Sequence, residues 1–305
     1  MDLNFVRLIF TLRLERNKED RFVLFGIKPF FEEAFLQSAG CPGNDGLPSE
    51  PCQCPYHQTF SQFLSTDPAA VKRYQKPSLP FVFQIPVLPP LPNRDRSLEL
   101  ELVLTGNAIN YLTVYLKAVT LMFRNPRFCS LLSVSLEKIE SSDYGGTRSL
   151  LMEGGVSGYR GNLATLSLSG VAECEVLPPD SVTITIITPM KLLVMGKPLR
   201  EVSFSPFIRS LFRRVSSLTY YSGGSESEFD YKWLADRSKQ VSCSASTLHW
   251  EEWGGKWSGL TGRATFAGDL TEFHPFLLAG EYLHLGKGAT FGLGRYILER
   301  ADQSL

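Results

Sequence analysis

The apolar positions of this chain switch repeatedly between the period of a strand and the period of a helix. Stretches rich in β-branched and aromatic residues, such as residues 5–14, predict strands, and stretches with apolar residues three or four apart predict helices. The first half is predicted to contain strands at 5–14, 81–85, 98–104 and 128–139, and helices at 29–37 and 107–123. The second half is predicted to contain strands at 182–187, 241–250, 260–266 and 295–299, and helices at 206–218 and 273–283.

Each half therefore has the order β-α-β-β-α-β, which is the ferredoxin-like arrangement. The predicted fold class is α+β, with tandem ferredoxin-like (RRM-like) domains built on antiparallel sheets. The linker is expected between Ser141 and Asp180, where glycines also favour a hairpin. We expect an N-terminal domain over residues 1–170, as the candidate catalytic domain, and a C-terminal domain over residues 171–305.

Composition limits the function classes. The chain has 305 residues, of which 43% are hydrophobic and 20% charged, values typical of a globular protein with two domains. No apolar run approaches the ~20 residues of a spanning helix, and residues 1–4 lack the start of a secretion signal. We therefore expect a cytoplasmic protein with no membrane partner. The sequence gives no indication of oligomeric state.

The net charge is zero, with 31 basic and 31 acidic residues, so only local basic patches can bind a nucleic acid. Residues 191–215 hold six basic residues and a single acid, Glu201. Within the predicted helix, three arginines are expected to project from the side opposite the apolar face. They are Arg209, Arg213 and Arg214. The two interpretations are a solvated face and an RNA-binding surface.

A glycine-rich segment near the end of the chain is the most informative motif. Residues 286–294 have the spacing G-x-G-x-x-x-G-x-G, which lets the backbone take positive φ and brings amides close to a ligand. Lys287 and Arg295 add positive charge, so the expected ligand is anionic. The helix–loop–strand order fits neither the P-loop nor the dinucleotide fingerprint.

The segment 284–296 resembles the C-terminal glycine-rich loop of CRISPR-associated endoribonucleases that process CRISPR precursor RNA, a family of the RAMP superfamily. The resemblance continues upstream through Thr188-Pro189-Met190-Lys191, through residues 204–214 and through residues 260–268. The N-terminal half is similar through its opening strand and through its cysteine cluster. In the family this loop contacts RNA. The resemblance implies that the path of the RNA strand is lined by Gly286, Lys287, Gly288, Gly292, Gly294 and Arg295.

What the resemblance implies about activity is metal-independent cleavage of CRISPR repeat RNA, leaving a 2′,3′-cyclic phosphate and a 5′-hydroxyl. The alternative is a catalytically inactive RAMP subunit that only holds guide RNA. The expected partners are CRISPR repeat RNA and subunits of a CRISPR effector complex. No cofactor is expected for the cleavage itself.

Four soft metal ligands lie within one predicted loop of the first half. Cys41, Cys52, Cys54 and His57 follow the pattern C-x(10)-C-x-C-x(2)-H. Such a set suffices for a closed tetrahedral zinc site. Buried or free thiols are the alternative, because the C-x-C pair is tighter than the usual spacing.

His57 is also the candidate general base, since it is the one histidine of the first half and the family usually uses a histidine there. Tyr56 is the candidate acid. A metal-bound imidazole cannot also serve as a free base, so the two roles of His57 exclude each other. His284 is the next candidate, whereas His249 and His274 are interpreted as structural, as is the tryptophan cluster at residues 250–257.

Overall fold

The computed structural model describes residues 3–15, 20–41, 52–74, 76–88, 97–153 and 161–300. These residues form two compact units, Val6–Thr165 and Leu166–Leu305, the second of which includes Met1–Phe5. In the part of the chain that is described, no helix has the length and hydropathy needed to cross a membrane.

The N-terminal unit is built on an antiparallel sheet with the strand order β2-β3-β1-β4-β5. Its strands are β1 (Asn4–Leu14), β2 (Phe81–Gln84), β3 (Ser97–Thr105), β4 (Val134–Ser142) and β5 (Arg148–Glu153). The first four strands lie in the order second, third, first, fourth, which is the order of a ferredoxin-like sheet. The strand β5 is added by a hairpin whose turn contains Gly146 with a φ of 79°.

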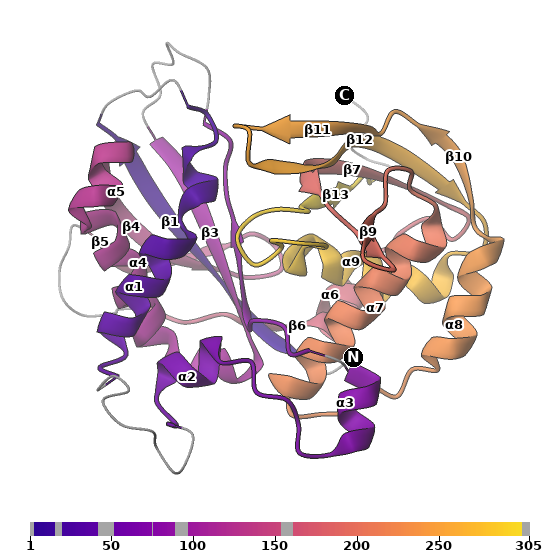
Figure 1. Ribbon diagram of the computed structural model, residues 1–305, viewed down its shortest axis with the longest axis horizontal. Coiled ribbons are helices and arrows are strands. Elements are labelled where there is room, and N and C mark those ends of the chain that lie inside the picture. Colours follow the sequence, from indigo (N-terminus) through magenta and orange to yellow (C-terminus); the bar gives the residue numbers. More distant parts are fainter. Residues whose placement is uncertain are drawn as a thin grey trace. The chain divides into compact units, whose positions relative to one another are not determined.

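Two helices, α1 and α4, pack together on this sheet (Figure 1). Between them lies an aromatic core in which the ring of Phe31 is 4.8 Å from that of Phe83, and the ring of Phe35 is 4.7 Å from that of Tyr115. The burial of these large rings contributes to the stability of this unit. The helices of the unit are α1 (Lys28–Ser38), α2 (Pro55–Phe60), α3 (Pro68–Tyr74), α4 (Leu112–Arg124) and α5 (Pro126–Leu131), with 3-10 turns η1 (Val23–Gly26) and η2 (Gly106–Tyr111).

The C-terminal unit repeats the same topology. Its sheet has the order β10-β12-β7-β13, with β11 added beside β12, and every recorded pair is antiparallel. The strands are β7 (Ser181–Met190), β10 (Ser242–Ser246), β11 (His249–Trp253), β12 (Trp257–Ala267) and β13 (Tyr296–Leu298), with the small hairpin β8 (Leu193–Val194) and β9 (Lys197–Pro198). The short strand β6 (Thr165–Ser167) pairs with β1 instead.

The helices α7 and α9 pack against each other on one face of this second sheet (Figure 1). In α7 the apolar stripe that includes Phe207, Leu211 and Val215 is fully buried, because residues three and four apart share one helix face. The helices of the unit are α6 (Leu168–Cys174), α7 (Phe204–Tyr221), α8 (Tyr231–Arg237) and α9 (His274–Leu283), with 3-10 turns η3 (Ser238–Gln240) and η4 (Thr271–Phe273).

The predicted fold class is confirmed, and three predicted elements are wrong in detail. Residues 126–131 are helical and only Val134–Ser142 forms the strand that was predicted over 128–139. The strand predicted over 241–250 is two strands, β10 and β11. The helix predicted over 107–123 begins with the 3-10 turn η2.

Candidate functional site

The glycine loop, defined as residues 284–296, follows α9 and leads into β13. All four of its glycines have positive φ: 91° at Gly286, 83° at Gly288, 87° at Gly292 and 66° at Gly294. At Gly294 an added Cβ atom would lie 1.7 Å from the carbonyl oxygen of Leu285. The spacing of the motif is therefore dictated by backbone geometry, because only glycine takes these conformations without strain.

Most amides of the glycine loop are used inside the protein. The amide of Leu285 donates to Gly294 O at 3.0 Å, and that of Lys287 donates to Lys191 O at 3.0 Å. Among the described residues, the amides of Gly286, Gly288 and Thr290 have no recorded acceptor. The loop thus offers a ligand a few amides rather than the whole set expected from the sequence.

A buried threonine that the sequence analysis did not single out as a site residue holds the loop in place. Thr188, at 0% exposure near the end of β7, accepts a hydrogen bond from the amide of Arg295 at 2.9 Å. Its hydroxyl donates to Gly292 O at 2.8 Å. This one side chain therefore holds the loop at both Gly292 and Arg295. The only sign of its role in the sequence is its place in the segment that carries the family resemblance.

The charged side chains of the glycine loop differ in exposure. Lys287 is exposed and Arg295 is half-buried. On α7, Arg209 and Arg213 are both exposed, and Arg213 donates to Ser210 Oγ at 2.9 Å. Burial and the neighbouring Arg209 lower the pKa of Arg213.

The prediction that three arginines project from the exposed side of the helix is wrong for Arg214. Its Nε donates to Leu283 O at 2.6 Å, its Nη2 is buried without a hydrogen-bond partner among the described residues, and burial lowers its pKa to about 10. The reason is helical geometry: residue 214 is three residues after Leu211 and four before Leu218, so it borders the buried stripe. Two of the three guanidiniums remain on the exposed side of α7.

His284 is unsuited to serve as the second candidate base. It is 0% exposed, its φ is 54°, and neither ring nitrogen has a partner at full hydrogen-bond geometry in the described part of the chain. Burial lowers the pKa of its imidazole well below the ordinary value, helped by the charges of Arg295 and Arg214, while the backbone of Ala289 acts in the opposite direction. The ring is therefore neutral and enclosed beneath the loop.

The other two C-terminal histidines and the tryptophans lie at the sheet and the start of α9. His274 Nε2 is 3.1 Å from Pro178 O, and His249 Nε2 is 3.4 Å from Thr261 Oγ1. Trp250 has the guanidinium of Arg200 4.4 Å from its ring centre and Lys191 Nζ 5.9 Å from it. This cation–π contact orders two basic residues of the 191–215 stretch.

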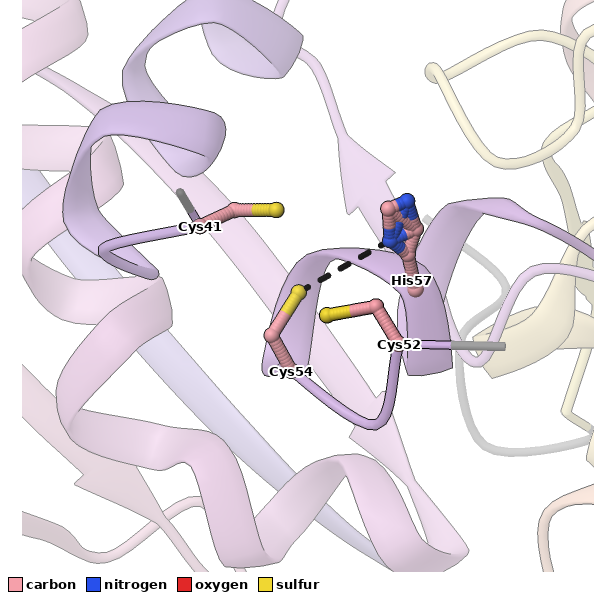
Figure 2. Close-up of side chains that lie close together, drawn as sticks. All are labelled: Cys41, Cys52, Cys54 and His57. Carbon is pink, nitrogen blue, oxygen red and sulfur yellow. Dashed lines mark hydrogen bonds between the residues drawn. The ribbon is translucent and has the colours of Figure 1, made fainter. Parts of the chain in front are cut away.

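In the N-terminal unit the structure brings together the four predicted soft ligands, hereafter the thiol–imidazole cluster (Figure 2). Their ligand atoms all lie within 4.8 Å of one another, and Cys54 Sγ is 3.8 Å from His57 Nδ1. Hydrogen bonds from Cys54 lower the pKa of Cys52, whereas burial raises that of Cys54. The cluster consists of Cys41, Cys52, Cys54 and His57.

Tyr56 and His57 occupy the first turn of α2, so they share a short helix rather than a strand. The two rings meet edge to face with their centres 5.6 Å apart, and Tyr56 also packs on Phe60 at 5.1 Å. Burial, followed by the charge of Glu32, raises the pKa of Tyr56. A phenol in this environment stays protonated and can donate a proton.

Two family models match parts of this chain. Residues 184–296 match the family model described as CRISPR-associated endoribonuclease Cas6, and residues 32–161 match a model described as an N-terminal domain. No curated protein matches the chain.

Among solved structures, a Cas6 product complex has a TM-score of 0.56 at 14% identity, covering 97% of this chain and 100% of that chain. Cas6 from Thermus thermophilus has a TM-score of 0.52 at 14% identity, covering 98% of this chain and 100% of that chain. A partial Cas6-RT-Cas1–Cas2 complex has a TM-score of 0.57 at 10% identity, covering 99% of this chain and 47% of that chain.

The resemblance to CRISPR-associated endoribonucleases is therefore confirmed, and it is carried by the unit that contains the glycine loop and α7. The whole chain has a Cas6-like fold.

Proposed function

Because residues 184–296 match the Cas6 endoribonuclease model, we propose that this protein binds CRISPR repeat RNA and cleaves it. The observation that carries the proposal is this match, which spans the rigid glycine loop with Lys287 exposed on it. Lys287 and the exposed pair Arg209 and Arg213 make no ion pair with a carboxylate among the described residues, so they are available for phosphates.

The proposed reaction is attack of the ribose 2′-hydroxyl on the adjacent phosphorus. The P–O bond to the 5′-oxygen of the next nucleotide breaks, giving a 2′,3′-cyclic phosphate and a 5′-hydroxyl. A base takes the proton of the 2′-hydroxyl, and an acid protonates the leaving oxygen. The one metal-ligand group found among the described residues is rich in thiols, whereas two-metal phosphoryl chemistry uses carboxylate-bound hard cations. This favours chemistry without a catalytic metal.

The assignment of His57 as the base and Tyr56 as the acid stays a prediction. His57 Nδ1 faces Cys54 Sγ, His284 is enclosed and His274 is bound to a backbone carbonyl. This distribution of the histidines favours the second candidate function, a RAMP subunit that binds guide RNA without cleaving it. An association with CRISPR effector subunits is part of both proposals.

The test uses labelled repeat RNA in EDTA, beside the same RNA with a 2′-deoxy nucleotide at the cleaved position. Cleavage of the all-ribose RNA to a cyclic phosphate, with the deoxy RNA bound but intact, is the expected result. Binding of both RNAs without cleavage would select the inactive subunit. Absence of binding would contradict both proposals.

The binding surface is tested by Lys287→Ala and Arg213→Ala. Each should reduce the salt dependence of RNA affinity by about 0.7 to 0.9 in the log–log slope, because each lost phosphate contact releases one counterion fewer. Lys239→Ala is the matched control, since its Nζ is already paired with Asp236 Oδ1 at 2.7 Å. Equal slopes for all three variants would place the RNA elsewhere.

A further inference from the structure

The thiol–imidazole cluster is built from two described segments of the chain. Cys41 lies three residues after the end of α1, Cys52 and Cys54 precede α2, and His57 belongs to the first turn of α2. The RNA-binding proposal makes no use of the three thiols. Figure 2 shows the side chains converging from these two segments on one region.

The spacing of the ligand atoms matches a tetrahedral metal site. With Zn–S bonds of about 2.3 Å and a Zn–N bond of about 2.0 Å, tetrahedral geometry separates two sulfurs by about 3.8 Å, and sulfur from nitrogen by about 3.5 Å. The observed separation of Cys54 Sγ and His57 Nδ1 is 3.8 Å, and no pair in the cluster exceeds 4.8 Å. Shifts of the ligand atoms by about 1 Å, through side-chain rotation, would therefore close the site.

We propose that the thiol–imidazole cluster binds one Zn²⁺ in a closed structural site, with His57 Nδ1 as its nitrogen ligand. Three thiolates and one imidazole are the Cys₃His set that zinc favours. Four protein ligands leave no position for a water or a substrate, so the ion is structural rather than catalytic. Binding releases one proton from each thiol.

A disulfide explains the cluster less well. The three thiols are an odd number, so a disulfide would leave one thiol and the imidazole without a role. All six cysteines are free in the structure, including three outside the cluster. Zinc uses all four groups.

The ion would fix a helix that is too short to be stable alone. The helix α2 has six residues, and isolated helices of that length do not persist. Its other anchors are Phe60, whose ring centre is 5.3 Å from that of Phe35, and Thr59, whose hydroxyl is 3.3 Å from Tyr115 OH. Zinc would cross-link the start of α2 to the end of α1 across the ten residues between Cys41 and Cys52. This cross-link would hold the two segments together in addition to these contacts.

One consequence concerns catalysis. A lone pair donated to zinc cannot take the proton of a 2′-hydroxyl, so this site removes His57 from the candidate bases. The zinc proposal itself does not depend on the ribonuclease proposal. The consequence for His57 does depend on it, and the two are tested separately.

The first experiment measures zinc in protein purified without a chelator. We expect about one zinc per chain, reduced at least tenfold in Cys52→Ser and Cys54→Ser. Cys174→Ser and Cys243→Ser are the matched controls, because both thiols are exposed and lie outside the cluster. A folded wild-type protein without zinc would overturn the proposal.

A second measurement on the wild-type protein does not depend on the folding of variants. Alkylation followed by mass spectrometry should label Cys174 and Cys243 at once, and the three cluster thiols only after a chelator is added. Labelling of the cluster without a chelator would overturn the proposal. So would cluster thiols that react only after a reductant, since these would form a disulfide.

The role of His57 is tested by comparing zinc content and RNA cleavage in His57→Cys and His57→Ala. If the imidazole is a ligand, His57→Cys keeps zinc as a Cys₄ site and keeps cleavage, whereas His57→Ala weakens zinc binding. If it is the general base, His57→Cys keeps zinc and loses cleavage by about 10²- to 10⁴-fold. That second result would overturn the inference about His57. A wild-type protein that holds zinc but cleaves no RNA would refute the ribonuclease proposal alone.

Discussion

In both units the second helix packed on the sheet precedes the fourth strand of the topology, and the connection between them is built differently. In the N-terminal unit the Asn125 side chain accepts from the amides of Arg127 at 2.9 Å and Phe128 at 3.4 Å, and α5 begins there. In the C-terminal unit four glycines with positive φ make the connection. The side chain of Asn125 satisfies the amides of its own turn, whereas the glycine turns leave Lys287 and Gly288 exposed.

Basic residues in ion pairs occur in both units, and those of the proposed RNA surface are not among them. In the N-terminal unit Arg7, Arg13, Arg127 and Arg148 each form an ion pair with a glutamate. The exposed pair on α7 and Lys287 have no such partner among the described residues. Ion pairs occur in the C-terminal unit as well, at Arg237, Lys239, Arg263 and Arg300. The difference is therefore confined to α7 and the glycine loop, whose exposed basic side chains stay open to phosphates.

The sharpest contrast between the two connections is expected from Gly294→Ala. The new Cβ atom would meet Leu285 O at 1.7 Å with φ at 66°, so we expect a loss of about 4 kcal/mol in the free energy of unfolding, with loss of RNA affinity. The control is Gly146→Ala in the β4–β5 turn, where φ is 79° and no atom lies within 4 Å of an added Cβ. It should cost about 1 kcal/mol and leave RNA binding unchanged. Urea unfolding of both variants measures the difference, and equal losses would contradict this account of the loop.

A second pair of variants compares two buried threonines. Thr188→Val keeps the shape of the side chain but leaves the amide of Arg295 and Gly292 O without their partner, so we expect a loss of about 2 to 3 kcal/mol. Thr105 in the N-terminal unit is equally buried, and its hydroxyl has no partner in the described part of the chain. Thr105→Val should therefore be neutral or stabilising. Denaturant titration decides, and a destabilised Thr105→Val together with an unaffected Thr188→Val would reverse the assignment.

Much of the fold could be predicted because the periodicity is strong where elements are long. The apolar spacing of α7 and the alternation in β3 gave the right element types, and the repeated order gave the topology. The strand predicted over 128–139 failed at 128–131, which belong to α5, because Asn125-Pro126 is a helix-start signal. Local capping outweighed residue preference there.

The candidate site was only partly predictable, because burial depends on how elements pack. The spacing of the glycines predicted residues with positive φ, and the spacing of the cysteines predicted that their side chains gather in one cluster. The burial of Arg214 and His284 could not be read from the sequence, since both residues are enclosed by contacts between α7 and the end of α9. Thr188 was overlooked because its partners lie more than a hundred residues away.

The enclosed, positively charged underside of the glycine loop predicts a pH dependence of stability. The pKa of His284 is far below its unfolded value of about 6.5. At pH values between these two pKa values, the unfolded chain binds a proton on this residue and the folded protein does not. Stability should therefore be unaffected above pH 6.5 and fall as the pH drops from there toward the folded pKa, by about 1.4 kcal/mol per pH unit. His284→Asn, which tolerates positive φ and does not titrate, should lose this slope. Burial also lowers the pKa of His274. Because both proteins contain His274, its contribution to the pH dependence cancels in the comparison. Identical pH slopes in the two proteins would show that His284 is not enclosed.

The smallest effect is expected at the N-terminal connection, from Asn125→Ala. Removal of the cap leaves the amides of Arg127 and Phe128 without their acceptor, which should cost about 1 kcal/mol in the free energy of unfolding. Asn125→Asp keeps an acceptor oxygen at the same position and should retain wild-type stability. Neither variant should change RNA affinity or its salt dependence, because in this unit the connection serves only the packing of α5. RNA affinity measured at two salt concentrations provides the check. A weakening in Asn125→Ala that disappears in Asn125→Asp would show that the capped connection, like the glycine loop, positions a contact to RNA.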